Sequence, residues 1–171
     1  MRTKSKLRAV LDSGPLIHLD EIGALSALSI FDAVFVAPGV REEIAPLLET
    51  VPAKVSKRLK FATLSGKDKD FSRVLSENYG IGLAEAEAIA VCKKEGIGLF
   101  LTDDLQARTT ATSLGIEVHG TIGILLRAFR TGILPKETTI SLVKSIPDQS
   151  SLFITSDLVE FVLAEIEKFK K

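Results

Sequence analysis

The sequence predicts an α/β fold in which a mostly parallel sheet lies between two layers of helices. Two observations lead to this fold class. Short apolar runs of three to five residues recur along the chain, and stretches with apolar residues at helical spacing separate them. Strands that alternate with helices in this way form a parallel sheet with helices on both faces. We therefore expect a three-layer α/β/α arrangement around a sheet of four to five strands.

In the first half of the chain, turn residues mark where the elements end. The first apolar run stops at Asp12, and Pro15 can occupy the first turn of the helix that follows. Gly23 predicts a break in that helix. The expected elements are a strand over residues 7–11, a helix over 16–28, a strand over 33–37, a helix over 40–48, and a helix or strand around 59–64.

In the second half, glycines follow the helical stretches. Gly96, Gly115 and Gly132 stand where glycine commonly ends a helix. The expected helices cover residues 71–79, 83–94, 105–114, 121–130, 136–146 and 156–169, and the expected strands cover 97–101 and 116–119, with 152–155 as an edge strand.

The balance of charge limits the classes of function. The 171 residues include 22 Lys and Arg and 22 Asp and Glu, so the formal net charge is zero. Proteins that bind nucleic acid mainly by bulk charge are usually strongly basic, so such a function must come from local charge placement here. The mean hydropathy of +0.26 argues against an acidic disordered chain. Because no apolar run approaches the ~18–20 residues of a membrane span, we expect a soluble cytoplasmic protein.

The chain has few residues for thiol or zinc chemistry. Cys92 is the single cysteine, which rules out an internal disulfide and suits a reducing compartment. With only His18 and His119 beside it, a structural zinc site is not expected. Cys92 is most simply a core residue, and both histidines are most simply structural or surface residues. His18 lies in the helix after Asp12, where a general base is conceivable.

Aspartates follow two of the predicted strands. Asp12 follows the first strand, and Asp103 and Asp104 follow the strand over 97–101. The carboxyl ends of parallel strands meet at one edge of the sheet, so these acids can converge. Crowded carboxylates repel one another unless a hard cation such as Mg²⁺ or Mn²⁺ compensates. Any one of them is equally well explained as a helix cap, Asp104 above all, but the set favours a metal site.

Glutamates at the start of the helix over 83–94 are further candidates. Glu85 shares a stripe with Ile89 and Cys92, which predicts that it points inward. An inward carboxylate requires a reason, although a place near the positive end of a helix is favourable in itself. Glu87 lies on the other side of the helix and is expected to be solvated.

The helix over 40–48 carries a second pair of glutamates. Glu43 lies near the inward stripe that Ile44 begins, and Glu42 lies roughly opposite Ile44. This placement favours Glu43 as the inward acid.

Five short segments, in a fixed order along the chain, carry a resemblance to a known family. They are residues 12–17 (DSGPLI), 36–44 (VAPGVREEI), 82–90 (GLAEAEAIA), 101–108 (LTDDLQAR) and 120–128 (GTIGILLRA). Each is unspecific alone, but their order resembles PIN-domain nucleases, and most of all the prokaryotic subgroup related to VapC toxins. The resemblance covers about residues 7–134. We therefore expect a single PIN-like domain over 1–171, with 135–171 as a C-terminal helical extension.

The resemblance implies a ribonuclease that uses Mg²⁺ or Mn²⁺, such as the toxin of a toxin–antitoxin pair, and by analogy a homodimer with an antitoxin protein as partner. The sequence departs from the family pattern at two places. The third acidic position holds a glutamate, Glu85, for which Glu87 stays an alternative, and the fourth holds two adjacent aspartates, Asp103 and Asp104. The expected metal ligands are Asp12, Glu43, Glu85, Asp103 and Asp104, and the expected catalytic residues are Asp12, Glu43, Glu85 and Asp104.

The chemistry of the residues agrees with this implication. Hydrolysis of a phosphodiester needs an activated water and neutralised charge on the leaving oxygen, and Mg²⁺ held by carboxylates supplies both. Ser13 and Thr102 could hold a water or a phosphate oxygen. The cations expected to bind RNA are Arg108, Arg127 and Arg130, of which the last two lie three residues apart on one helix. Each is otherwise an ordinary solvated arginine. Aromatic residues make up only 6% of the chain, so extensive base stacking is not expected.

Two other functions remain open. A non-catalytic RNA- or protein-binding module on the same fold would leave the acids as helix caps. Aspartyl-phosphate chemistry also uses aspartates at strand ends, but the residue two positions after Asp12 is a glycine rather than a second aspartate. Neither Gly-x-x-x-x-Gly-Lys-Ser/Thr nor Gly-x-Gly-x-x-Gly occurs in the chain, which excludes the two common nucleotide-binding loops.

Overall fold

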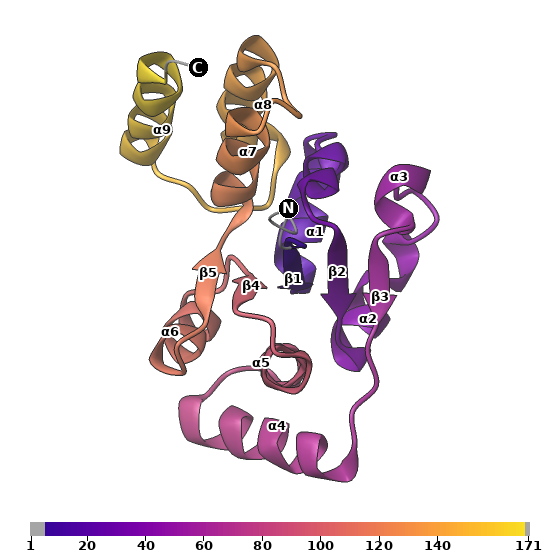
Figure 1. The fold of residues 1–171 in the computed structure, drawn as a ribbon. Helices are drawn as coiled ribbons and strands as arrows, with labels where there is room; N and C mark the ends of the chain where they lie inside the picture. The colour runs from indigo at the N-terminus through magenta and orange to yellow at the C-terminus, as the bar shows by residue number, and fades with distance from the viewer. Residues whose placement is uncertain (1–5, 170–171) are drawn as a thin grey trace, which may run out of the picture.

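A five-stranded, all-parallel sheet forms the centre of the computed structural model, which describes residues 6–169 (Figure 1). The strand order is β3-β2-β1-β4-β5, so the first strand of the chain lies in the middle. The register places Val10 beside Phe35 on one side and Phe100 on the other. The strands are β1 (Arg8–Leu11), β2 (Ala33–Val36), β3 (Leu59–Phe61), β4 (Leu99–Leu101) and β5 (Glu117–His119).

The central strands are short and almost wholly apolar because helices cover both of their faces. Val10 and Leu11 of β1 and Phe100 and Leu101 of β4 are fully buried. The predicted α/β class with a parallel sheet is confirmed. The stretch around residues 59–64, for which a helix or a strand was expected, contains strand β3. The expected edge strand over residues 152–155 is wrong: this stretch joins no ladder among the described residues.

Helices form a layer on each side of the sheet (Figure 1). They are α1 (Ser13–Glu21), α2 (Pro38–Ile44), α3 (Ala53–Ser56), α4 (Gly66–Tyr79), α5 (Leu83–Glu95), α6 (Leu105–Ser113), α7 (Thr121–Arg130), α8 (Lys136–Gln149) and α9 (Ser156–Lys168), with 3-10 turns η1 (Leu25–Ile30) and η2 (Ala45–Leu47). The helix α5 packs on β1, β2 and β4 and carries α4 on its outer side, whereas α1, η1 and α7 contact one another. Within residues 6–169, none of the helices has the length and apolar character needed to cross a bilayer.

Local sequence explains where the helices differ from the predicted bounds. Gly23 takes a left-handed conformation (φ 68°), which divides the expected helix over 16–28 into α1 and η1. The helix α4 begins five residues earlier than expected because Ser65 and Asp68 form a capping box. In that box the Ser65 amide donates to Asp68 Oδ2 at 2.8 Å, and the Asp68 amide donates to Ser65 Oγ at 3.3 Å.

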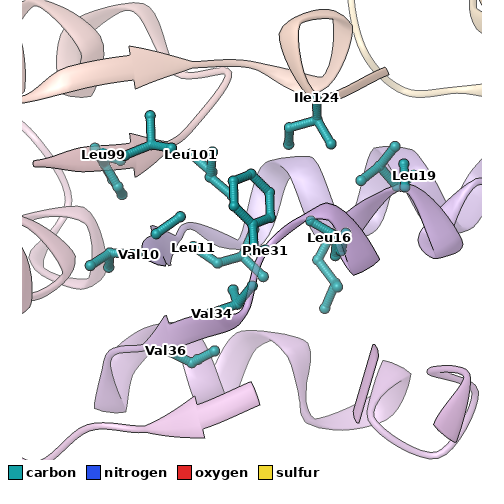
Figure 2. Close-up of a cluster of buried hydrophobic side chains, with 14 of the residues drawn as sticks. Val10, Leu11, Leu16, Leu19, Phe31, Val34, Val36, Leu99, Leu101 and Ile124 are labelled. Atoms are coloured by element: carbon teal, nitrogen blue, oxygen red, sulfur yellow. The ribbon is translucent and has the colours of Figure 1, made fainter. Parts of the chain in front are cut away.

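Phe31 occupies the middle of the hydrophobic core, where side chains from the sheet, α1 and α7 meet (Figure 2). Phe31, Leu11, Leu16 and Ile124 are fully buried. Burial of each such side chain contributes roughly 1.5–3 kcal/mol. This packing holds the ends of β1 and β4, and with them the residues that follow each strand, in a defined position.

Candidate functional site

The residues that follow the strands meet at the carboxyl edge of the sheet. Pairing continues one residue beyond the strands: the Asp12 amide donates to the Leu101 carbonyl at 2.9 Å, and the Thr102 amide donates to the His119 carbonyl at 2.9 Å. Asp12 and Thr102 therefore lie side by side, as the parallel arrangement predicts for residues that follow neighbouring strands.

Asp12 is a buried carboxylate held by two hydrogen bonds. Its side chain is 4% exposed, Oδ2 accepts from Thr102 Oγ1 at 2.6 Å, and Oδ1 accepts from the Ser13 amide at 2.8 Å. The pKa of Asp12 is raised to about 6: burial raises it most, the charges of Glu85 and Glu43 add to this, and the two hydrogen bonds act in the opposite direction. An ionised Asp12 is therefore costly unless a positive charge compensates for it.

Glu43 and Glu85 lie near enough to Asp12 for their charges to act on its pKa, and they come from α2 and α5. Glu43 is exposed, so the inward placement expected for it is wrong, whereas Glu85 is half-buried with its carboxylate close to Gly82 at the start of its own helix. The two helices approach closely because Gly39 has no side chain: a Cβ there would lie 3.1 Å from the Cα of Ala84. Close approach of α2 and α5 brings both glutamates to the edge that holds Asp12.

Glu87 is not the solvated residue that helix periodicity predicts. It is half-buried, and its Oε2 accepts a hydrogen bond from the Gly39 amide at 2.7 Å. The first amides of a helix have no partner within the helix, so the first turn of α2 requires an outside acceptor. Glu87 supplies it and thereby joins α5 to α2.

The adjacent aspartates after β4 have separate partners. Both oxygens of Asp103 are engaged: Oδ1 accepts from the Thr121 amide at 2.7 Å, and Oδ2 accepts from Thr121 Oγ1 at 2.5 Å and lies 2.8 Å from His18 Nδ1. Although burial raises the pKa of Asp103, the hydrogen bonds from His18 and Thr121 hold it below its ordinary value. Asp104 is exposed and caps α6, with Oδ1 accepting from the Ala107 amide at 2.7 Å.

The donor set is suited to a hard cation. Across residues 6–169, no three His, Cys, Asp or Glu side chains lie in an arrangement that could hold a metal ion as they stand. The acids at this edge nevertheless offer carboxylate oxygens, which Mg²⁺ and Mn²⁺ prefer. Burial and the nearby charges of Glu85 and Glu43 raise the pKa of Asp12, so an uncompensated carboxylate is disfavoured there. The acids at this edge, Asp12 with Glu85 and Glu43 nearby, are thus of the chemical type that holds a divalent ion.

Of the three arginines expected to bind RNA, the structure brings one to this edge. Arg108 is half-buried, and its Nη1 donates to the Thr102 carbonyl at 3.3 Å. The helix α7 begins at the carboxyl edge and runs back along the sheet, so its last turn lies far from the acids. Arg127 lines a cleft beside Arg8 and Leu99 at the amino ends of β1 and β4, and Arg130 lies 6.0 Å from the ring centre of Phe169.

The two hydroxyl residues expected at the site both contact Asp12. Thr102 is fully buried, and its hydroxyl donates a hydrogen bond to the carboxylate of Asp12. Ser13 donates to the same carboxylate through its backbone amide. The link from Asp103 to His18 and Thr121 was missed by sequence reasoning. No local sequence pattern pairs residues that lie so far apart in the chain. The only signal was that the first backbone amides of α7 have no partner within the helix and therefore need an acceptor nearby.

Comparison with known proteins agrees with this geometry. Residues 8–168 match a family model described as a PIN domain, so the match includes α8 and α9 as well as the sheet. No curated protein sequence matches the chain. PIN domains are typically nucleases and generally bind divalent metal ions. The chain belongs to the PIN-domain family.

Proposed function

We propose that the protein is a metal-dependent endoribonuclease that hydrolyses RNA phosphodiester bonds at the carboxyl edge of its sheet. One observation carries the proposal: Asp12 is buried near Glu85 and Glu43, and its pKa is raised chiefly by burial and further by their charges. A buried carboxylate with other acids nearby is unfavourable, and a bound cation would offset this cost. Membership of a family that is typically nucleolytic supports the same function.

In this proposal each residue at the edge has a distinct role. Asp12, Glu43 and Glu85 would hold Mg²⁺ or Mn²⁺, and Asp104 would add the oxygen that it does not use to cap α6. When bound, the ion supplies an activated water and neutralises charge on the leaving oxygen. Asp103 has both oxygens engaged, so we assign it the role of positioning the loop after β4 rather than that of a ligand.

The chain's own residues orient this site for RNA. Thr102 and the Ser13 amide hold the Asp12 carboxylate in one orientation, which reduces the reorganisation needed when an ion binds. Arg108 stands beside the edge with a guanidinium suited to a phosphate group. Arg127 and Arg130 lie too far away to share this role.

The order of the five segments further supports a place in the VapC-related subgroup. A toxin of a toxin–antitoxin pair, acting in the cytoplasm as a homodimer and restrained by an antitoxin protein, is the corresponding proposal for its biology. Co-purification of the protein with the product of a neighbouring gene, and the mass of the complex, would test it.

Cleavage of RNA in the presence of Mn²⁺ tests the proposed activity. Asp12→Asn should reduce the rate by about 100-fold or more, since even the loss of an outer partner of a metal ligand costs about 10–100-fold. Asp70→Asn is the matched control, because Asp70 is 72% exposed on α4 and pairs with Arg73. Equal cleavage by the wild-type protein and Asp12→Asn would exclude this site.

One observation favours a second candidate, a non-catalytic RNA- or protein-binding module. The acids of residues 6–169, in the positions that the structure gives them, form no group of three ready to hold an ion. Calorimetry with Mn²⁺ separates the two functions: a protein that binds no Mn²⁺ at millimolar concentration is the binding module.

A further inference from the structure

A groove of about 470 Å³ opens beside the acids, at the carboxyl ends of β4 and β5. Its walls come from the start of α6, the turn between β5 and α7, and the segment between α8 and α9, which Figure 1 shows passing the start of α7. Its volume lies within the roughly 300–1,000 Å³ of pockets that bind small molecules. Asp103 and Arg108 line it, and Asp103 directly follows Thr102, the residue whose hydroxyl donates to Asp12.

Two of its lining residues are the most exposed large apolar side chains in the described part of the chain. Phe153 is 89% exposed and Leu105 is 77% exposed. Apolar surface of this extent is unfavourable in water and commonly marks a binding site when it lies in a concave region.

Phe153 stands on a segment that is held in place. Glu21 Oε2 accepts hydrogen bonds from Ser150 Oγ at 2.8 Å and from the Ser151 amide at 2.7 Å, which fastens the segment to the end of α1. Leu152 and Ile154 are half-buried on either side of Phe153. Leu152 and Ile154 therefore anchor the segment that was expected to be an edge strand, and the ring of Phe153 points outward. A ring presented on a fixed segment loses little entropy when a ligand stacks on it.

The floor of the groove is charged. The absence of a side chain at Gly120 leaves room for both charged groups, because a Cβ there would clash with Asp103 Oδ1 and lie 3.1 Å from Arg108 Nη1. Asp103 is joined to the turn by its bonds to Thr121. A cation beside an exposed aromatic ring is the combination that binds single-stranded nucleic acid, where bases stack and phosphates pair.

We propose that this groove binds one nucleobase of a single-stranded RNA next to the phosphate to be cleaved, with the base stacked on Phe153 and its phosphate on Arg108. The inference rests on the proposed ribonuclease function and defines its substrate as unpaired RNA. A second copy of the chain is a poorer occupant, because Arg108 and Asp103 would lose water in an apolar interface. One base stacked on Phe153 is also compatible with a chain in which only 6% of residues are aromatic.

Binding of a short single-stranded RNA that contains 2-aminopurine tests the proposal without cleavage. Ca²⁺ replaces Mn²⁺ in this experiment, so that binding is measured separately from hydrolysis. Stacking on Phe153 should quench the fluorescence of 2-aminopurine, and Phe153→Ala should abolish the quenching and weaken binding by about tenfold. Phe153→Trp should restore both. Phe161→Ala is the matched control, since Phe161 is 62% exposed on α9 and does not line the groove.

The results that overturn the proposal are equally defined. Unchanged quenching and affinity in Phe153→Ala, or no RNA binding by the wild-type protein, would exclude the base-binding groove. If Phe153→Ala instead converts a dimer into monomers in light scattering, the surface is an interface between copies. RNA that binds and quenches in Ca²⁺ but is not cleaved in Mn²⁺ supports the groove and refutes the ribonuclease function, so the two failures are distinguishable.

Discussion

Replacement of Asp12 by Asn should stabilise the metal-free protein at about pH 8. The folded protein raises the pKa of Asp12 from 3.8 to about 6, chiefly through burial. An acid with a raised pKa binds its proton more tightly in the folded state than in the unfolded chain. The free energy of unfolding therefore falls as the pH rises between these two values, and the whole cost is present above about pH 7.

The magnitude follows from the size of the shift. A rise of about 2 pKa units corresponds to roughly 3 kcal/mol, and Asp12 is buried deeply enough that solvent screening reduces this little. Asn has nearly the same shape and carries no charge. Its oxygen can accept from the Ser13 amide, and its amide group can donate to the Thr102 hydroxyl. Asp12→Asn should thus recover up to about 3 kcal/mol at about pH 8 and almost none below about pH 4.

Urea unfolding with EDTA present, from about pH 4 to about pH 8, measures this difference. The stability of the wild-type protein should fall with pH relative to Asp12→Asn, and Mn²⁺ should stabilise the wild-type protein but not the variant. Asp70→Asn is again the control and should show no such divergence. If Asp12→Asn is destabilised by the same amount at every pH, Asp12 is a structural acid with an ordinary pKa, and the reasoning from charge crowding fails.

Three further predictions follow from the same contacts. Gly39→Ala should lower the free energy of unfolding, measured in urea, by about 1–3 kcal/mol, because its Cβ would lie 3.1 Å from the Ala84 backbone. It should also weaken Mn²⁺ binding by moving Glu43 away from α5. An unchanged free energy of unfolding would show that α2 shifts freely. Asp103→Ala should lower the free energy of unfolding by about 1–3 kcal/mol at neutral pH, because the Thr121 amide loses its acceptor. Since folding lowers the pKa of Asp103, this difference from the wild-type protein should shrink as the pH falls below the ordinary pKa of Asp. A difference that persists at low pH would contradict this prediction. Burial raises the pKa of the Cys92 thiol to about 12, so a disulfide reagent should label it in urea but not in the folded protein, and rapid native labelling would refute this burial.

Sequence reasoning reached the sheet and the central acids because both depend on local patterns. Apolar runs such as the one that ends at Leu11 identified the buried strands, and parallel topology then placed Asp12 beside Thr102. Helix periodicity favoured Glu43 and Glu85, the two glutamates whose charges act on the pKa of Asp12.

The remaining features depend on contacts between distant segments, which no local pattern contains. The half-buried Glu87 accepts from Gly39 because α2 and α5 touch, and periodicity within one helix cannot show this. Arg127 was expected to face RNA together with Arg130 because the two lie three residues apart on one helix, but that helix runs back along the sheet and carries Arg127 to its amino edge. Residues 152–155 were expected to form an edge strand, yet the segment is held by Glu21 and by the core and not by strand pairing.

A crystal structure of the protein in millimolar Mn²⁺, with the metal located by anomalous scattering, tests the central claim most directly. The expected result is an ion at the carboxyl edge of the sheet, coordinated by Asp12, Glu43 and Glu85, with the Thr102 hydroxyl still bonded to Asp12. An edge without an ion at that concentration, or an ion that Asp12 does not coordinate, would contradict the account.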